Sequence, residues 1–240
     1  MKYGIIAAGE GSRLAREGIA VPKPLVRIAG ESLIDRLVGI FCKNGADEIS
    51  LICNEEMANV KQHIAEMAEK WKAEGRDVKL NLTVKSTPSS MHSFGELAEG
   101  FDGDEPFIVT TVDTVFCEDS FADYVGSFVA TIEKDGCDGL MGVTNYIDDE
   151  KPLYVGVDAD GCINGFYDEK HGGYISAGIY GLTPRCVLTL RRCIERGESR
   201  MRNFQRALIA DGIRLKAFDM GKVMDIDHAD DIAKAEEMLK

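Results

Sequence analysis

The chain has 240 residues, of which 45% are hydrophobic, and this is enough apolar material for one large α/β domain with a buried core. A formal net charge of −13 argues against nucleic acid or an anionic membrane as a partner, because both are strongly negative themselves. Seven scattered cysteines without a C-x-x-C pair, together with the lack of a signal peptide or an apolar run of membrane length, predict a reduced, cytoplasmic protein.

The chain opens with a short strand that runs into a glycine-rich loop. The strand is predicted over residues 2–8, and Gly9 and Gly11 lie in the loop that follows. Glycine has no Cβ and tolerates positive φ, so such a loop lets the backbone approach an anion closely. Arg13 and Lys23 add a planar guanidinium and a mobile ammonium, two complementary ways of holding phosphate groups. A strand that ends in such a loop indicates a phosphate site in an open α/β sheet.

Strands and helices then alternate, which predicts a three-layer α/β/α fold with a mostly parallel central sheet. Ser32 is the expected N-cap of a helix that ends at Asn44-Gly45. The next elements are a strand at 49–53, a helix at 55–74, a strand at 78–85, a helix beginning near Ser93, a strand at 106–112, a helix at 119–134 and a strand at 140–144.

The pattern changes after Pro152. Residues 153–157 and 162–167 flank a turn at Asp160-Gly161 and predict an antiparallel hairpin. The remaining elements are a strand at 174–182, helices at 184–196 and 202–211, a strand at 213–218 and a helix at 229–239. No internal repeat or low-complexity linker interrupts the chain, so we expect a single domain over residues 1–240 with a small antiparallel insertion at about 150–182.

Three phosphate-binding motifs compete for the N-terminal loop. A dinucleotide-binding fingerprint would need a third small residue where this chain has Leu14, and a P-loop would need Gly-Lys-Ser/Thr closing a longer glycine frame. The third motif is G-x-G-(S/T)-R followed by P-K-P-L, and residues 9–13 and 22–25 match it throughout. On these residues the chain resembles the sugar-phosphate nucleotidyltransferase (nucleoside-diphosphate-sugar pyrophosphorylase) family.

The resemblance implies a Rossmann-like fold and a magnesium-dependent transfer of a nucleoside monophosphate from a nucleoside triphosphate to a phosphorylated acceptor, with release of pyrophosphate. A sugar 1-phosphate is the favoured acceptor class. In an acidic protein, local Arg and Lys side chains and a divalent cation such as Mg²⁺ would hold these anionic substrates. Catalytic roles are implied for Arg13 and Lys23. The residues expected to bind the nucleotide are Ala8, Gly9, Gly11, Ser12, Arg13, Lys23 and Ser90.

Two acidic segments are candidates for the metal site. Asp113 follows the strand at 106–112, where ligands bind in open α/β sheets, although an aspartate there is also common in turns. In an extended late segment, Asp225 and Asp227 would point to one face. Capping of the last helix is the alternative role, for Asp227, Asp230 and Asp231. The resemblance implies that Asp113 binds Mg²⁺ with Asp225 or Asp227, and a hard cation with few protein oxygens suits this set.

Two segments of the insertion resemble the family's acceptor-binding elements, and the resemblance implies that this region covers the acceptor side of the cleft. Glu169 and Lys170 lie in a segment similar to E-K-P, and Gly178 lies in one similar to N-(A/S)-G-(I/L)-Y. Both segments depart from the pattern, with His171 in place of proline and Ser176 in place of asparagine. The acceptor therefore stays open between a sugar 1-phosphate and phosphocholine or another small phosphorylated compound.

Two further functions are alternatives. A catalytically idle nucleotide-sugar-binding or regulatory protein would keep the fold, but it would have no chemical need for Arg13, Lys23 and Asp113. A dinucleotide-dependent oxidoreductase is disfavoured by Leu14 and by the early Lys23. The nucleotide base and the oligomeric state do not follow from the sequence, and a homo-oligomer is compatible with it.

Overall fold

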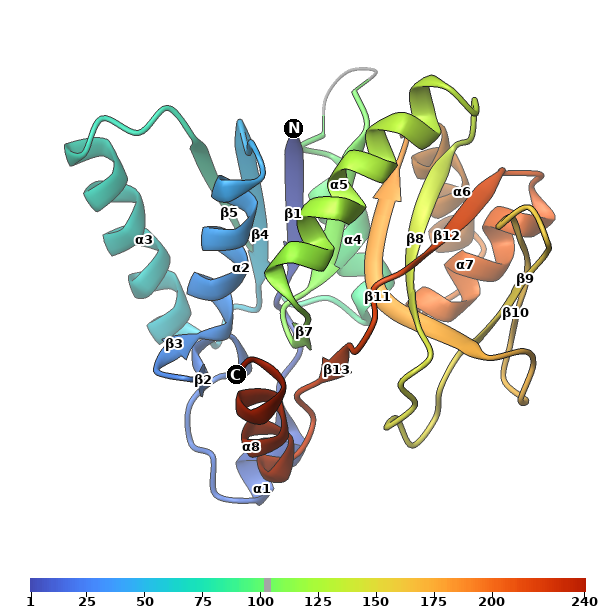
Figure 1. Ribbon diagram of the computed structural model, residues 1–240. Coiled ribbons are helices and arrows are strands. Elements are labelled where there is room, and N and C mark those ends of the chain that lie inside the picture. The colour runs from blue at the N-terminus through green and yellow to red at the C-terminus, as the bar shows by residue number, and fades with distance from the viewer. Residues whose placement is uncertain (102–104) are drawn as a thin grey trace.

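The computed structural model describes residues 1–101 and 105–240 and contains a nine-stranded sheet with helices on both faces (Figure 1). The strands of this sheet are β1 (Lys2–Ile6), β4 (Glu48–Cys53), β5 (Lys79–Val84), β6 (Phe107–Thr111), β8 (Gly139–Thr144), β9 (Tyr154–Val157), β10 (Ile163–Tyr167), β11 (Tyr174–Leu182) and β12 (Leu215–Asp219). Their order is β10-β9-β11-β6-β1-β4-β5, with β8 paired to β11 and β12 paired to β8.

The part of the sheet built by the first half of the chain is parallel. β1 lies between β4 and β6, and β5 extends the sheet beyond β4, all in the same direction. The side chains of Tyr3 and Ile5 are buried on one face and that of Ile6 on the other, so β1 is apolar nearly throughout, as a strand covered on both faces must be. The predicted strands and their parallel order are confirmed here.

The helices divide between the two faces of the sheet. Buried side chains of α2 (Leu33–Lys43), α3 (Ala58–Ala73) and α5 (Glu118–Glu133) pack in one core cluster, and those of α4 (Ser90–Ala98), α6 (Pro184–Glu195) and α7 (Met201–Ala210) pack in the other. The predicted N-cap of α2 is confirmed, because the Asp35 N–H donates to Ser32 Oγ at 3.2 Å. α4 begins at Ser90, earlier than the expected start near Ser93. Within the described residues, no helix combines the length and apolar character that crossing a bilayer requires.

The predicted hairpin continues the sheet. β9 and β10 pair antiparallel, and β9 also pairs with β11, whereas β11 runs antiparallel to both β6 and β8. The antiparallel character expected for the insertion is therefore confirmed, and the hairpin is joined to the main sheet by backbone hydrogen bonds.

Short elements that the sequence patterns did not indicate gather at the carboxyl ends of the parallel strands, below the sheet in Figure 1. They are α1 (Ser12–Arg16), the hairpin of β2 (Arg27–Ile28) and β3 (Glu31–Ser32), β7 (Thr114–Val115) and β13 (Met224–Asp225). The predicted C-terminal helix, α8 (Ala229–Met238), lies beside them. This edge is where open α/β sheets bind their ligands.

Candidate active site

The glycine-rich loop leaves β1 and turns into α1 at Gly11. This glycine has a φ of +63°, in the left-handed region that other residues adopt at a cost. A Cβ on Gly11 would also lie 3.2 Å from the Cβ of Lys23. Glycine at this position therefore lets the loop pass close to the lysine, and the two separate parts of the motif meet in space.

This loop lines an open cleft of about 630 Å³, here called the loop cleft. The segment 86–90, at the start of α4, also lines it. All the residues expected to bind the nucleotide line the loop cleft, namely Ala8, Gly9, Gly11, Ser12, Arg13, Lys23 and Ser90. The structure thus brings the first loop and the segment before α4 together. From the sequence, these two segments were related only by the prediction that both bind the nucleotide.

Lys23 lies between two carboxylates in this cleft. Its side chain is 10% exposed, and its ammonium binds Asp113 Oδ2 at 2.5 Å and Asp227 Oδ1 at 2.8 Å. Burial by itself lowers the pKa of Lys23, but the two carboxylates outweigh burial and raise this pKa above its ordinary value. The lysine is therefore charged, and its ammonium is held where the early motif meets both acidic segments.

A two-stranded ladder brings Asp113 next to the late acidic segment. β7 begins directly after Asp113, and Thr114 in β7 pairs with Asp225 in β13. The Ile226 N–H also donates to the Asp113 carbonyl oxygen at 3.0 Å. Residues that are far apart in the sequence are thus fixed side by side at the carboxyl edge of the sheet.

Asp225 carries an excess of negative charge in its surroundings. The side chain of Asp225 is exposed to the cleft, yet the protein around it and the nearby Asp113 carboxylate raise its pKa above the ordinary value, while a hydrogen bond from the Thr114 hydroxyl and the charge of Lys23 act in the opposite direction. Among the described residues, Asp225 has no ion-pair partner. A cation bound beside Asp113 and Asp225 would relieve their repulsion.

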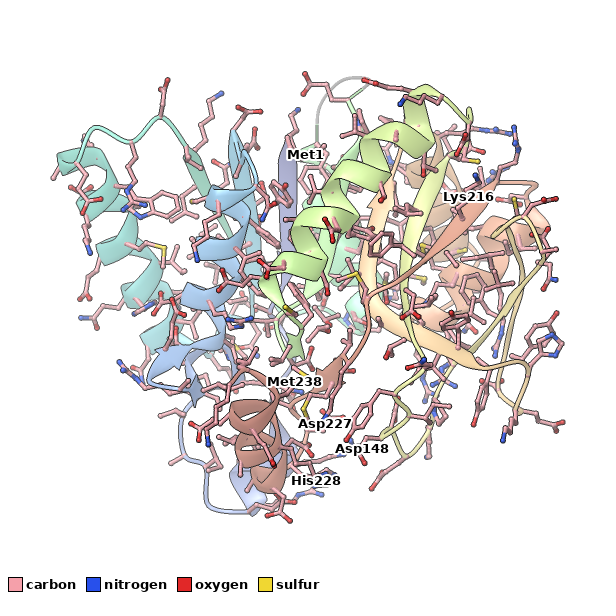
Figure 2. All side chains as sticks on the ribbon, viewed as in Figure 1. Met1, Asp148, Lys216, Asp227, His228 and Met238 are labelled. Atoms are coloured by element: carbon pink, nitrogen blue, oxygen red, sulfur yellow. The ribbon has the colours of Figure 1, made fainter. Side chains whose placement is uncertain are left out.

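Asp227 has a different environment. The backbone N–H groups of Asp227 and His228 both donate to Asp231 Oδ2, at 3.1 and 2.8 Å, so Asp231 supplies the side-chain cap of α8. The capping alternative is therefore wrong for Asp227 and correct for Asp231. The Asp227 carboxylate instead binds Lys23 and, at 3.0 Å, the Arg13 guanidinium. Figure 2 shows Asp227 and His228 at the start of α8.

A second cavity, of about 220 Å³, shares Arg13 and Asp227 with the loop cleft, and we call it the acidic cavity. Asp225 also lines it, together with Tyr146 and Ser176. The other acidic side chains in its lining are Asp148, Asp149, Glu150, Asp230 and Asp231, whereas its basic or titratable cationic side chains among the described residues are Arg13, His228 and Lys234. Because the two cavities share residues, ligands bound in each of them would meet at Arg13 and Asp227.

A comparison with known protein families identifies the family to which this chain belongs. The family model described as nucleotidyl transferase matches residues 3–240. The chain belongs to this family. It is 28% identical over 192 residues to the mannose-1-phosphate guanylyltransferase catalytic subunit beta of Dictyostelium discoideum, which covers 77% of this chain and 50% of the relative. The chain therefore spans about half the length of that relative.

Solved structures with low sequence identity share the fold of this nucleotidyl transferase. The inositol-1-phosphate CTP transferase of T. maritima has a TM-score of 0.77 at 20% identity, with 100% of this chain and 97% of that chain covered. The CTP:phosphocholine cytidylyltransferase of Streptococcus pneumoniae has a TM-score of 0.74 at 19% identity, with 100% and 99% covered. The α/β fold predicted from the sequence is thus found in whole chains of similar extent.

The residues predicted to bind the acceptor do not line either cavity, although Gly178 directly follows Ala177 of the acidic cavity and packs against Thr111 of the loop cleft. Among the described residues that line either cavity, none is Glu169, Lys170 or Gly178. Glu169 and Lys170 are exposed beyond the end of β10, and the preceding Asp168 is held by Arg202 at 2.6 Å and by an arginine of the same helix, Arg206, at 2.7 Å. An acceptor role for Glu169 and Lys170 stays a prediction. A ligand would have to extend beyond the two cavities to contact either side chain.

Gly178 has a structural requirement of its own. Its φ is +70°, and a Cβ there would lie 2.7 Å from Thr114 Oγ1 and 3.0 Å from Thr111 Oγ1. The backbone of β11 therefore packs directly against two hydroxyl groups next to Asp113. This close approach explains why the position needs glycine without invoking a ligand.

We expect Gly178→Ala to destabilise this nucleotidyl transferase by about 2–4 kcal/mol, because a left-handed φ and an overpacked contact each cost about 1–2 kcal/mol or more. Chemical denaturation measures the change in the free energy of unfolding. Gly126→Ala is the matched control, because Gly126 lies in α5 with ordinary φ and open space around its Cβ, so alanine should be neutral or stabilising there. Equal stability of the two variants would contradict the packing described for Gly178.

Asn54 is a site residue that the sequence patterns did not single out. It is 8% exposed, directly follows β4, donates from Nδ2 to the Ala8 carbonyl oxygen at 3.2 Å, and accepts from the Glu56 N–H at 3.0 Å. It thereby ties the glycine-rich loop to the end of β4. Its position after a buried strand was the available signal, and the same reasoning that found Asp113 applies to it.

Proposed function

We propose that this chain catalyses transfer of a nucleoside monophosphate from a nucleoside triphosphate to a phosphorylated acceptor, with a sugar 1-phosphate as the favoured acceptor class. The observation that carries the proposal is the position of Lys23 in the loop cleft, where its ammonium binds Asp113 and also Asp227, a residue that lines the acidic cavity as well. Through Asp227, the Lys23 ammonium lies next to the residues that the two cavities share, so it can contact phosphates of ligands bound on either side. The mannose-1-phosphate guanylyltransferase relative supports the same reaction class.

In this reaction an oxygen of the acceptor phosphate forms a bond to the α-phosphorus of the triphosphate. The bond from the α-phosphorus to the bridging oxygen breaks, and its electron pair leaves with pyrophosphate. The attacking phosphate is already anionic at neutral pH, so no general base is needed. Gly9 and Gly11 let the backbone approach the triphosphate, Arg13 binds the departing pyrophosphate, and Lys23 bridges the α-phosphate and the acceptor. Catalysis is then mainly positioning and charge stabilisation.

We propose that Asp113 and Asp225 hold Mg²⁺ in this reaction. Among the described residues no three His, Cys, Asp or Glu side chains form a group that could hold a metal alone. Two carboxylates with the remaining positions taken by waters and substrate phosphates fit Mg²⁺, which dehydrates reluctantly and prefers oxygen ligands. When bound, the ion would neutralise negative charge that develops on the phosphates. Asp225 is favoured as the second ligand because it lies next to the Asp113 segment and forms no ion pair among the described residues, whereas Asp227 is bound by Lys23 and Arg13.

We propose a different role for Asp227, which would orient cationic side chains and not hold the metal. Its carboxylate holds the Lys23 ammonium and the Arg13 guanidinium at the junction of the two cavities. Both cationic side chains are therefore oriented before the substrates bind, so less conformational entropy is lost on binding.

If the acceptor binds in the acidic cavity, the lining of this cavity favours one alternative acceptor within the same reaction. The acidic cavity has more carboxylates than cations among its described lining residues. A phosphorylated amine such as phosphocholine would place its phosphate at Lys23 and its positive end among these carboxylates. The fold shared with CTP:phosphocholine cytidylyltransferase is compatible with this alternative. Carboxylates also accept hydrogen bonds from sugar hydroxyls, so the two acceptor classes are to be compared directly.

The experiment combines nucleotide screening with product release. ATP, CTP, GTP and UTP, each with Mg²⁺, are first compared by thermal shift, and pyrophosphate release is then measured with sugar 1-phosphates, phosphocholine and phosphoethanolamine. We expect one preferred triphosphate and release that requires both Mg²⁺ and an acceptor. Binding of a nucleotide or nucleotide sugar without release from any pair would favour the idle regulatory protein, and stabilisation by NAD alone would favour the oxidoreductase.

We expect Arg13→Ala to raise the KM for the triphosphate by about 10-fold or more, because a charged hydrogen bond to phosphate contributes about 1.5–3 kcal/mol. Steady-state kinetics with varied triphosphate and saturating acceptor measure the change. Arg16→Ala, at an exposed arginine in the same short helix that lines neither cavity, is the matched control and should keep the wild-type KM. An unchanged KM in Arg13→Ala would remove this arginine from the phosphate site.

A further inference from the structure

The Asp225 carboxylate is fixed by a buried threonine. Thr114 is 2% exposed and faces Asp225 across the β7–β13 ladder, and its hydroxyl donates to Asp225 Oδ1 at 2.9 Å. Among the described residues, Asp225 Oδ2 accepts no hydrogen bond. The contact therefore holds one oxygen of the carboxylate and leaves the other available to a ligand.

A second threonine stands behind the first. Thr111, at the end of β6, lies with its Oγ1 at 2.6 Å from Thr114 Oγ1. A hydroxyl has one proton to donate, and an ionised carboxylate can only accept. Since Thr114 uses its proton on Asp225, it must accept from Thr111. The hydrogen bonds therefore run in one direction, from Thr111 through Thr114 to Asp225.

The backbone of β11 packs against the hydroxyls of Thr111 and Thr114. Gly178 approaches both hydroxyls so closely that no Cβ would fit. Thr111 and Thr114 flank Asp113 in the sequence, so the same short segment supplies Asp113 and orients Asp225. Packing and hydrogen bonding together restrict the rotation of a carboxylate that would otherwise turn away from its negative neighbour.

We propose that Thr114, supported by Thr111, is a positioning residue that sets the affinity of the site for a divalent cation. This inference rests on the proposed function, since it takes Asp113 and Asp225 as the ligands of that ion. Hydrogen bonds to a ligating carboxylate fix its orientation before the ion arrives, and losing such a partner commonly weakens metal affinity 10–100-fold.

The test measures binding of Mn²⁺, a paramagnetic substitute for Mg²⁺, to the full chain by electron paramagnetic resonance. We expect Thr114→Val to raise the Kd for Mn²⁺ by about 10–100-fold, and Thr114→Ser, which keeps the hydroxyl, to remain close to wild type. Thr111→Val keeps the contact to Asp225 but removes the donor behind it, so its Kd should fall between these two. The melting temperature of each variant is recorded alongside.

A matched control separates metal affinity from stability. Thr189 in α6 is fully buried, and its hydroxyl donates to the Asp211 carboxylate at 2.6 Å, outside both cavities. Thr189→Val removes the same kind of hydrogen bond, so it should lower stability and leave the Kd for Mn²⁺ unchanged.

Three outcomes overturn the inference: a wild-type Kd in Thr114→Val, a Thr114→Ser variant as weak as Thr114→Val, or an equal loss of affinity in Thr189→Val. Should Thr114→Val not fold, Thr111→Val and Thr114→Ser decide it, and a wild-type Kd in Thr111→Val then counts against it. If the wild-type protein itself binds no Mn²⁺ and shows no metal-dependent transfer, the proposed function fails instead, so the two failures are distinguishable.

Discussion

Asp113→Asn is expected to lower kcat by about 1000-fold or more, because the charge that holds the ion contributes several kcal/mol to stabilising the transition state. Asparagine keeps the shape and a hydrogen-bonding oxygen, so the fold should survive. The dependence of the rate on Mg²⁺ should weaken sharply at the same time. Pyrophosphate release measured over a range of Mg²⁺ concentrations gives both quantities. Asp123→Asn, at an exposed position of α5, removes one charge elsewhere and should have no effect.

The two late aspartates should respond differently to the same substitution. Asp225→Asn should reproduce the loss of Mg²⁺ dependence seen with Asp113→Asn. Asp227→Asn should keep the dependence on Mg²⁺ and lower kcat/KM, because Lys23 and Arg13 lose the carboxylate that orients them. Unchanged Mg²⁺ dependence in both late variants would mean that the two-carboxylate site is wrong, and the reverse pattern would make Asp227 the second ligand.

Lys23→Ala is expected to lower kcat/KM by about 100-fold or more, or roughly 3 kcal/mol of transition-state stabilisation. The structure adds a consequence for stability. Without the ammonium, Asp113 and Asp227 repel each other at low Mg²⁺, so the variant should melt earlier than wild type and regain more stability when Mg²⁺ is added. Steady-state kinetics and thermal melting with and without Mg²⁺ measure the two effects.

Lys216→Ala is the control for Lys23→Ala. Lys216 forms an ion pair with Asp135 at 2.7 Å and lies far from Asp227 in Figure 2. It should leave kcat/KM unchanged and show the same response to Mg²⁺ as the wild type. Near-normal kinetics in Lys23→Ala would instead mean that the lysine belongs to a structural turn, and the assignment of the loop would have to be abandoned.

Local features of the sequence sufficed to predict the loop and the parallel sheet. Gly9, Gly11 and Arg13 act within a few residues of one another, where sterics and charge are set by neighbours in the chain. Likewise, Asp113 could be placed because a continuous apolar run marks a buried strand and the chain direction marks its carboxyl end. The helix cap at Ser32 was predictable for the same reason, since an N-cap depends on a side chain and an N–H within one turn.

The contacts of Asp225, Asp227 and Gly178 were decided by the tertiary structure. An extended acidic segment in sequence does not reveal which carboxylate meets Asp113, which meets Lys23 and which caps a helix, because the pairing of β7 with β13 is too short to leave a periodic pattern. A glycine in a strand likewise indicates a close approach without naming the atoms approached, here the hydroxyls of Thr111 and Thr114. Features that depend on neighbouring residues in the chain, such as the glycine-rich loop and the Ser32 cap, were therefore determined by the sequence itself. Contacts between distant segments depended on the packing that places those segments side by side.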